Sequence, residues 1–125
     1  MSNNIKKILL VDDDSRNIFA LNAVLKARGY RCETAISAIE GIKKLNEDQE
    51  IGIVLMDMMM PEMDGYEAIA NIRGNQKTAA IPVIAVTAQA MVGDRERCLA
   101  AGANGYISKP VDVDLLTELL NIHLK

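Results

Sequence analysis

The chain has 125 residues, which fits a single domain that can bury one core without disulfides or a structural metal. Half of its residues are hydrophobic and a quarter are charged, which excludes intrinsic disorder. The net charge of −3 argues against a basic face that binds nucleic acid.

No segment resembles a leader peptide or a membrane anchor. Residues 1–7 are polar and lack the apolar stretch of a signal peptide, and no apolar run approaches the roughly 20 residues that cross a bilayer. The two cysteines, Cys32 and Cys98, lie far apart and form no metal or redox motif. The sequence therefore predicts a cytoplasmic protein that binds neither nucleic acid nor a membrane.

Short apolar runs alternate with amphipathic segments in the first half of the chain. The pattern predicts strands at 5–11, 30–35 and 51–56, separated by helices at 16–28 and 37–46. Gly29 ends the first helix, and Ser37 with Glu40 has the spacing of a capping box at the second. The run 51–56 is short and almost wholly apolar, which is typical of a strand covered on both faces.

The second half repeats this alternation. It predicts a loop at 58–65, helices at 66–73, 90–101 and 113–124, and strands at 81–86 and 106–107. Five strands alternating with five helices predict a doubly wound α/β fold, in which helices cover both faces of a parallel sheet. No linker or repeat interrupts the pattern, so we expect one domain spanning residues 1–125.

Polar residues follow the predicted strands. In an open parallel sheet, ligands bind at the carboxyl ends of the strands. The predicted strands place five residues at this edge: Asp12, Asp13, Asp57, Thr87 and Lys109. The first strand ends in an aspartate triplet, and Asp57 follows the most apolar run of the chain.

Carboxylates that converge at one edge repel each other, and a bound divalent cation relieves this repulsion. Without Cys or His nearby, such a cluster favours Mg²⁺, Ca²⁺ or Mn²⁺ over zinc. Because Mg²⁺ typically takes one or two carboxylates, another can act as a nucleophile and form an acyl phosphate. Lys109 and Thr87 are placed to hold the phosphoryl oxygens.

Four motifs in this order resemble the receiver domain of bacterial two-component response regulators. They are Val11–Asp14, Met56–Gly65, Val86–Ala88 and Ser108–Pro110. The similarity covers nearly the whole chain. It implies a flavodoxin-like sheet in the strand order 2-1-3-4-5, which receives phosphate from a histidine kinase or a histidine phosphotransfer protein.

The resemblance also assigns roles to residues at the metal. Asp57 would be the phosphoacceptor. Asp12, Asp13 and Asp57 would hold Mg²⁺, with Mn²⁺ as an alternative, and Met59 would add its backbone carbonyl. Such a domain is not an enzyme acting on another substrate, but promotes its own phosphorylation and dephosphorylation.

Further residues would contact the phosphoryl group or switch conformation. The resemblance implies that Thr87, the backbone of Ala88 and Lys109 contact the phosphoryl group, and that the Lys109–Pro110 bond is cis. Thr87 and Tyr106 would change together and alter the face formed by the last helices and strands. A downstream protein would respond to this face.

Residues 88–98 resemble receivers of hybrid sensor kinases. The chain nevertheless begins with Met1 and ends just after the last predicted helix, as a single-domain, chemotaxis-regulator-like protein would. A free-standing regulator and a fragment of a hybrid kinase both remain open.

Plainer interpretations exist for the same residues. Asp12, Asp13 and Asp14 could only cap the helix that follows, which is the role we expect for Asp14. The run Met58–Met60 is typical of packing and loop surface rather than a soft-metal site.

Two other protein classes share parts of the pattern. A haloacid-dehalogenase-type phosphohydrolase also has an Asp-x-Asp after a strand, but Arg16 replaces the expected Thr or Val, 125 residues leave no cap domain, and Asp57 stays unexplained. A nucleotide- or flavin-binding module would need a glycine-rich phosphate loop after the first strand, where this chain has carboxylates.

Overall fold

The computed structural model describes residues 6–88 and 92–124. Strands and helices alternate throughout. In chain order they are β1 (Lys7–Val11), α1 (Ser15–Ala27), β2 (Cys32–Ala35), α2 (Ala38–Glu47), β3 (Ile51–Asp57), α3 (Gly65–Gly74), β4 (Val83–Thr87), α4 (Asp94–Ala101), β5 (Gly105–Ser108) and α5 (Val113–His123).

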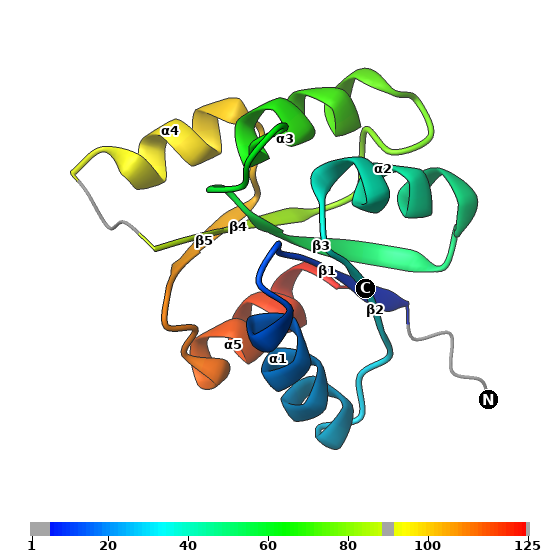
Figure 1. The fold of residues 1–125 in the computed structure, drawn as a ribbon, viewed down its shortest axis with the longest axis vertical. Coiled ribbons are helices and arrows are strands. Elements are labelled where there is room, and N and C mark those ends of the chain that lie inside the picture. The colour runs from blue at the N-terminus through cyan, green and yellow to red at the C-terminus, as the bar shows by residue number, and fades with distance from the viewer. Residues whose placement is uncertain (1–5, 89–91, 125) are drawn as a thin grey trace.

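The five strands form one parallel sheet in the order β2-β1-β3-β4-β5. Helices α1 and α5 cover one face, and α2, α3 and α4 cover the other (Figure 1). The predicted doubly wound fold and its strand order are confirmed. No helix in the described ranges is long and apolar enough to cross a membrane.

The sheet separates two apolar layers, and β3 contributes to both. Ile53 and Leu55 pack with α1 and α5, whereas Val54 and Met56 pack with α2, α3 and α4. All four side chains are at most 3% exposed. The apolar run at 51–56 is therefore explained as predicted: both faces of this strand are covered by helices.

The strand register aligns the tips of the strands. Val11 of β1 lies beside Met56 of β3, and Asp57 lies beside Val86 of β4. Thr87 in turn lies beside Ser108 of β5. The residues that follow each strand therefore emerge at one edge, where the sequence analysis placed the candidate site residues.

Two elements of the second half start at least two residues later than predicted. The helix predicted from Ala90 begins at Asp94, because Val92 and Gly93 form a turn in which Gly93 has a φ of 86°; Ala90 itself lies outside the described residues. Strand β4 begins at Val83 rather than Ile81, because Ile81 donates its N–H to a turn carbonyl and the following Pro82 has none to donate.

Helix caps differ in detail from the sequence prediction. Ser37 Oγ accepts a hydrogen bond from the Glu40 N–H as predicted, but the Glu40 carboxylate accepts from the N–H of Ile36 instead of Ser37. A complete capping box occurs at α3, between Asp64 and Glu67. The sequence analysis missed it because it placed residues 58–65 in a loop.

Candidate functional site

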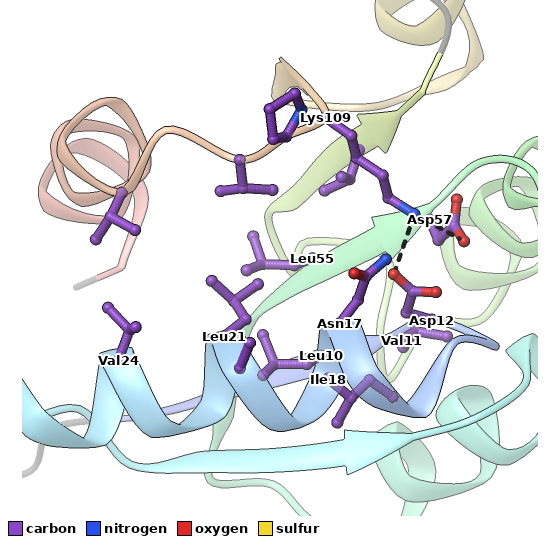
Figure 2. Close-up of a pocket in the computed structure, with 15 residues that line it drawn as sticks. Leu10, Val11, Asp12, Asn17, Ile18, Leu21, Val24, Leu55, Asp57 and Lys109 are labelled. Carbon is purple, nitrogen blue, oxygen red and sulfur yellow. Dashed lines mark ion pairs between the residues drawn. The ribbon is translucent and has the colours of Figure 1, made fainter.

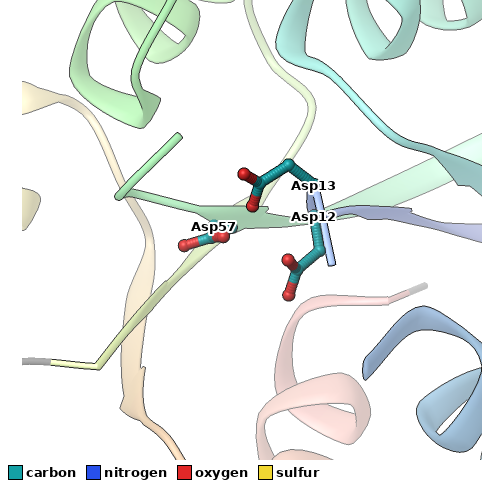
Figure 3. A group of neighbouring side chains, drawn as sticks. All are labelled: Asp12, Asp13 and Asp57. Carbon is teal, nitrogen blue, oxygen red and sulfur yellow. The ribbon is translucent and has the colours of Figure 1, made fainter. Parts of the chain in front are cut away.

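Three carboxylates converge at the carboxyl edge of the sheet. Asp12 and Asp13 follow β1, and Asp57 is the last residue of β3. One carboxylate oxygen from each lies within 4.8 Å of the other two (Figure 3). Asp13 is exposed, whereas Asp57 is only 3% exposed. The structure therefore brings together the carboxylates that the sequence analysis placed at this edge, and we refer to them as the carboxylate cluster.

Backbone donors fix two members of the carboxylate cluster. Asp12 Oδ1 accepts a hydrogen bond of 2.9 Å from the N–H of Asp14, and Asp57 Oδ1 accepts one of 3.0 Å from the N–H of Met59. Asp14 itself caps α1, because its Oδ1 accepts from the N–H of Arg16. The capping interpretation of the aspartate triplet is therefore correct for Asp14.

The loop after β3 is tightly packed under the site. A Cβ at Gly65 would lie 2.6 Å from the Met58 Cα and 3.0 Å from the Asp57 carbonyl oxygen. Glycine is thus needed at this position for α3 to start so close to the tip of β3. Met58 and Met60 are buried and Met59 is exposed, so this run is packing and loop surface as expected.

Lys109 brings the nearest positive charge to the carboxylate cluster. Its Nζ lies 3.2 Å from Asp12 Oδ2 and 3.5 Å from Asp57 Oδ2 (Figure 2). Its backbone N–H donates to the Thr87 carbonyl at 2.7 Å, and the Lys109–Pro110 peptide bond is cis as expected. The side chain is therefore anchored at the end of β5 and reaches across the edge to β1 and β3.

Burial dominates the electrostatics of Asp57. Desolvation raises its pKa to about 6, although the hydrogen bond from Met59 and the charge of Lys109 lower it, and the Asp12 carboxylate raises it further. Burial also opposes the charge on Lys109, but its hydrogen bond to Asp12 and the charge of Asp57 outweigh this effect and raise the Lys109 pKa. The site thus holds more negative charge than its one lysine offsets.

The donor set suits a hard divalent cation. All three members of the carboxylate cluster offer oxygen atoms, which Mg²⁺ and Mn²⁺ prefer, whereas zinc sites draw on Cys and His. A cation would also favour the charged form of Asp57, whose pKa is raised by burial. The residues present therefore fit the metal that the sequence analysis expected.

Thr87 and Ala88 lie on the other side of Asp57. Thr87 is the last residue of β4 and is only 2% exposed, whereas the next residue, Ala88, is exposed. Since β4 pairs directly with β3, the Thr87 side chain and the Ala88 backbone emerge at the same edge as Asp57.

An apolar cavity of about 240 Å³ adjoins the cluster between α1 and the loop that leads into α5. Leu10, Leu21 and Leu55 line its body, and Asp57 and Lys109 lie at one end (Figure 2). The site is thus open to the space between these two elements.

A group of side chains next to the site was not predicted from the sequence. Tyr66 of α3 and Tyr106 of β5 both donate hydrogen bonds to Asp94, the first residue of α4. Only Tyr106 had been singled out. In the sequence, Asp94 after Gly93 looks like an ordinary helix start, and nothing in the spacing connects it with two tyrosines 28 and 12 residues away.

Comparison with known proteins identifies the family of this chain. The family model of the response regulator receiver domain matches residues 8–121. The chain therefore belongs to the response regulator receiver domain family, and it is a receiver domain of two-component signalling. This result excludes the haloacid-dehalogenase and flavin-binding alternatives.

Individual relatives are of two kinds. The chain is 38% identical over 122 residues to the sensor histidine kinase RcsC of Salmonella typhimurium, covering 98% of this chain but only 13% of that protein. It is 34% identical to the polar-differentiation response regulator DivK of Brucella ovis, covering 95% of this chain and 96% of that protein. The chain thus spans about an eighth of this kinase and nearly all of this regulator.

Solved structures of receiver domains share the fold of this chain. A receiver protein from Pseudomonas putida has a TM-score of 0.89 at 30% identity, covering 98% of this chain and 99% of that one. The receiver domain of the sensor histidine kinase PA1611 from Pseudomonas aeruginosa has a TM-score of 0.86 at 35% identity, covering 95% and 97%. The latter was solved with a magnesium ion coordinated in its active site cleft.

Proposed function

We propose that this receiver domain accepts a phosphoryl group on Asp57, in a Mg²⁺-dependent reaction, from a histidine of a kinase or a phosphotransfer protein. One observation carries the proposal. Asp57 is a buried carboxylate at a strand tip, with a pKa raised to about 6, and both the carboxylate cluster and Lys109 converge on it.

We assign the metal to Asp12, Asp13, Asp57 and the backbone carbonyl of Met59. The oxygen donors of the carboxylate cluster support this assignment, as does the magnesium ion in the related receiver domain of PA1611. Mn²⁺ is an alternative occupant, because it shares the preference for oxygen ligands. The bound cation would offset the negative charge that gathers on the phosphoryl oxygens.

In the transfer step, a carboxylate oxygen of Asp57 attacks the phosphorus of the phosphohistidine. An O–P bond forms and the P–N bond breaks, with its electron pair remaining on the imidazole nitrogen. The Met59 N–H holds Asp57 Oδ1 in place, and Lys109 faces Oδ2. Most of the catalysis is therefore positioning and charge stabilisation, and the domain promotes its own phosphorylation and later hydrolysis without acting on another substrate.

Three groups would hold the new phosphoryl oxygens. Lys109 lies 3.5 Å from Asp57 and can form an ion pair with them. The Thr87 hydroxyl and the Ala88 backbone N–H can donate from the end of β4, which pairs with β3 beside Asp57. Thr87 ends β4, and Ala88 and Lys109 directly follow β4 and β5, so the sheet brings all three groups to the edge where Asp57 lies.

The output would be a change at Thr87 and Tyr106. When the Thr87 hydroxyl turns toward the phosphoryl group it vacates space, and the half-buried Tyr106 ring can move inward to fill it. Tyr106 lies beside Ala85 of β4 and packs against the core on the α4 side. The surface of α4, β5 and α5 would then present a different face to a downstream protein.

A histidine kinase is the expected phosphodonor, since the related protein RcsC is itself a sensor histidine kinase. We place the domain in the cytoplasm, where the ATP that such kinases use is made. The phosphodonor and the cellular location are independent of the chemistry of Asp57, so either assignment can be wrong while Asp57 is still the phosphoacceptor.

The test is phosphorylation by a small acyl phosphate such as acetyl phosphate. With Mg²⁺, intact mass spectrometry should show one added phosphoryl group on the wild-type chain and none after chelation. Asp57→Asn should remove the product. Asp48→Asn is the matched control, since Asp48 is also an ion-paired aspartate but lies at the opposite edge of the sheet. Equal phosphorylation of Asp57→Asn and the wild type would refute the proposal.

A further inference from the structure

One carboxylate connects three elements on the output side of the molecule. Asp94 Oδ1 accepts a hydrogen bond of 3.3 Å from the Tyr66 hydroxyl, and Asp94 Oδ2 accepts one of 3.1 Å from the Tyr106 hydroxyl. Tyr66 belongs to α3, Tyr106 to β5 and Asp94 to α4. We call these three residues the Asp94 bridge.

The Asp94 bridge is a principal attachment of α4. This helix has eight residues, and Cys98 is its buried residue. Two more contacts of α4 lead to Tyr66: the Arg97 guanidinium lies 5.1 Å from its ring centroid, and Cys98 Sγ lies 3.7 Å from its hydroxyl. At the other end of the helix, the Arg73 guanidinium donates to the Gly102 carbonyl. The position of α4 therefore depends strongly on hydrogen bonds and a cation–π contact rather than on a wide apolar face.

Asp94 does not cap its own helix. Helix α4 starts after Gly93, which forms no side-chain capping bond. An aspartate at a helix start is ordinarily explained by capping or by the helix dipole. Here both carboxylate oxygens face outward to tyrosines on neighbouring elements, which is a connection between elements rather than a local helix signal.

The bridge also borders the proposed phosphorylation site. Asp94 and Tyr66 line a cavity of about 510 Å³ together with Met58, Met59 and Thr87. Met59 is the residue whose N–H holds Asp57, and Thr87 ends the strand beside it. Thr87 therefore shares this cavity with Asp94 and Tyr66, two members of the bridge.

We propose that Asp94 is a positioning residue that sets the balance between the two output states, by holding Tyr106 and α4 in the unphosphorylated arrangement. The Tyr106 hydroxyl cannot keep its bond to Asp94 when the ring moves inward. The bond therefore stabilises one state and not the other, and only such differential contacts shift an equilibrium. This inference rests on the proposed function of Asp57 and Tyr106.

The size of the effect follows from population arithmetic. A ligand that binds only the switched state has an apparent affinity reduced by the fraction of molecules already in that state. Loss of one charge-assisted hydrogen bond that is specific to the unswitched state should raise that fraction, and hence the affinity, by on the order of fivefold. The beryllofluoride–Mg²⁺ complex, a mimic of the phosphoryl group, is the probe.

The experiment compares three variants of the whole chain. Asp94→Ala removes both acceptor oxygens, and Asp94→Asn keeps one of them. Glu96→Ala is the matched control, because it removes an exposed carboxylate from the first turn of the same helix. The chain has three tyrosines and no tryptophan, so 3-fluorotyrosine labelling gives three ¹⁹F signals that Tyr→Phe variants assign.

In Asp94→Ala without the mimic, the Tyr66 and Tyr106 signals should both shift, and the Tyr106 signal should move toward its position in the mimic-bound wild type. The mimic should bind about fivefold more tightly to Asp94→Ala, by an intermediate factor to Asp94→Asn, and as in the wild type to Glu96→Ala. Unchanged mimic affinity in Asp94→Ala, or an equal gain in Glu96→Ala, overturns the proposal.

Failure of the proposed function gives a different result. If Asp57 is not the phosphoacceptor, either the wild type gains no phosphoryl group or Asp57→Asn gains one as readily as the wild type. If Asp57 is phosphorylated in all three variants but the Tyr106 signal of Asp94→Ala stays at its wild-type position, the role of Asp94 alone is wrong.

Discussion

Charged side chains gather at both ends of strand β1. At its start, Lys7 Nζ lies 2.8 Å from Asp48, 3.3 Å from Glu33 and 3.7 Å from Glu50. We call these four residues the Lys7 cluster, and Arg31 adds a second cation there, 2.9 Å from Glu50. Past the end of β1 lies the carboxylate cluster, of which Asp12 and Asp57 lie within 3.5 Å of Lys109 Nζ.

The two clusters behave oppositely. Hydrogen bonds with Asp48 and Glu33 raise the pKa of Lys7, and the hydrogen bond with Lys7 lowers that of Asp48, so each partner favours the charge of the other. Burial instead raises the pKa of Asp57 to about 6 despite Lys109. The Glu50 side chain is 62% exposed, whereas that of Asp57 is 4% exposed. The candidate site at Asp57 thus differs from the Lys7 cluster, an ordinary surface ion-pair network, because its carboxylate is buried and its negative charge is only partly neutralised.

The largest expected effect separates the two lysines. Lys109→Ala should slow phosphorylation of Asp57 by roughly 100-fold, the scale of losing one donor that stabilises developing negative charge. Lys7→Ala should leave the rate unchanged, because Lys7 lies at the opposite edge of the sheet. The rate of phosphoprotein formation with acetyl phosphate measures both. A comparable loss in Lys7→Ala would show that the two clusters are not functionally distinct.

The second prediction separates neighbouring aspartates. Asp13→Ala should weaken Mg²⁺ binding by about tenfold, or about 1.4 kcal/mol. Asp14→Ala should leave Mg²⁺ binding nearly unchanged, since Asp14 already caps α1. Isothermal titration with Mg²⁺ measures both affinities. Equal losses would mean that Asp14, and not only the carboxylate cluster, faces the cation.

The third prediction concerns pH and stability without metal. Between about pH 4 and pH 6 the folded chain holds a proton on Asp57 that the unfolded chain releases, so stability falls as pH rises through this window. Asp57→Asn should flatten this fall and raise stability at pH 7 by about 2 kcal/mol. Urea unfolding at pH 4 and pH 7, with chelator present, checks it. A less stable Asp57→Asn at pH 7 would contradict the assigned burial cost.

The smallest effect concerns the Lys7 cluster. Asp48→Asn should lower stability by at most about 1 kcal/mol at neutral pH, as for other partly exposed ion pairs. The sign is opposite to that at Asp57: because the Asp48 pKa is lowered, its contribution is present above its unfolded pKa and is lost as pH falls. The same urea series measures it. If Asp48→Asn raised stability at neutral pH, as Asp57→Asn is expected to do, the two clusters would not differ in their contribution to stability.

The sequence was sufficient for the fold and for the carboxylate cluster because both depend on local order. Buried strands are short apolar runs, and parallel strands bring the residues that follow them to one edge. Asp12, Asp13 and Asp57 could therefore be placed together without knowing any distance. The start of α4 could not be placed in this way, because the spacing of apolar residues does not show that a turn at Gly93 precedes the helix.

The Asp94 bridge shows a second limit. Its bonds join residues of three elements, and their geometry depends on how α3, α4 and β5 pack rather than on any spacing. The Lys7 cluster has the same property, since Glu33 and Asp48 lie 26 and 41 residues from Lys7. Long-range side-chain partners of this kind need the tertiary structure.

The most direct measurement maps the phosphoryl group itself. After reaction with acetyl phosphate and Mg²⁺, borohydride reduction converts an aspartyl phosphate into homoserine, which peptide mass spectrometry locates. We predict homoserine at position 57 and at no other aspartate, and none when Mg²⁺ is chelated. Homoserine at Asp12 or Asp13, or an unmodified Asp57 in a phosphorylated chain, would contradict the central assignment.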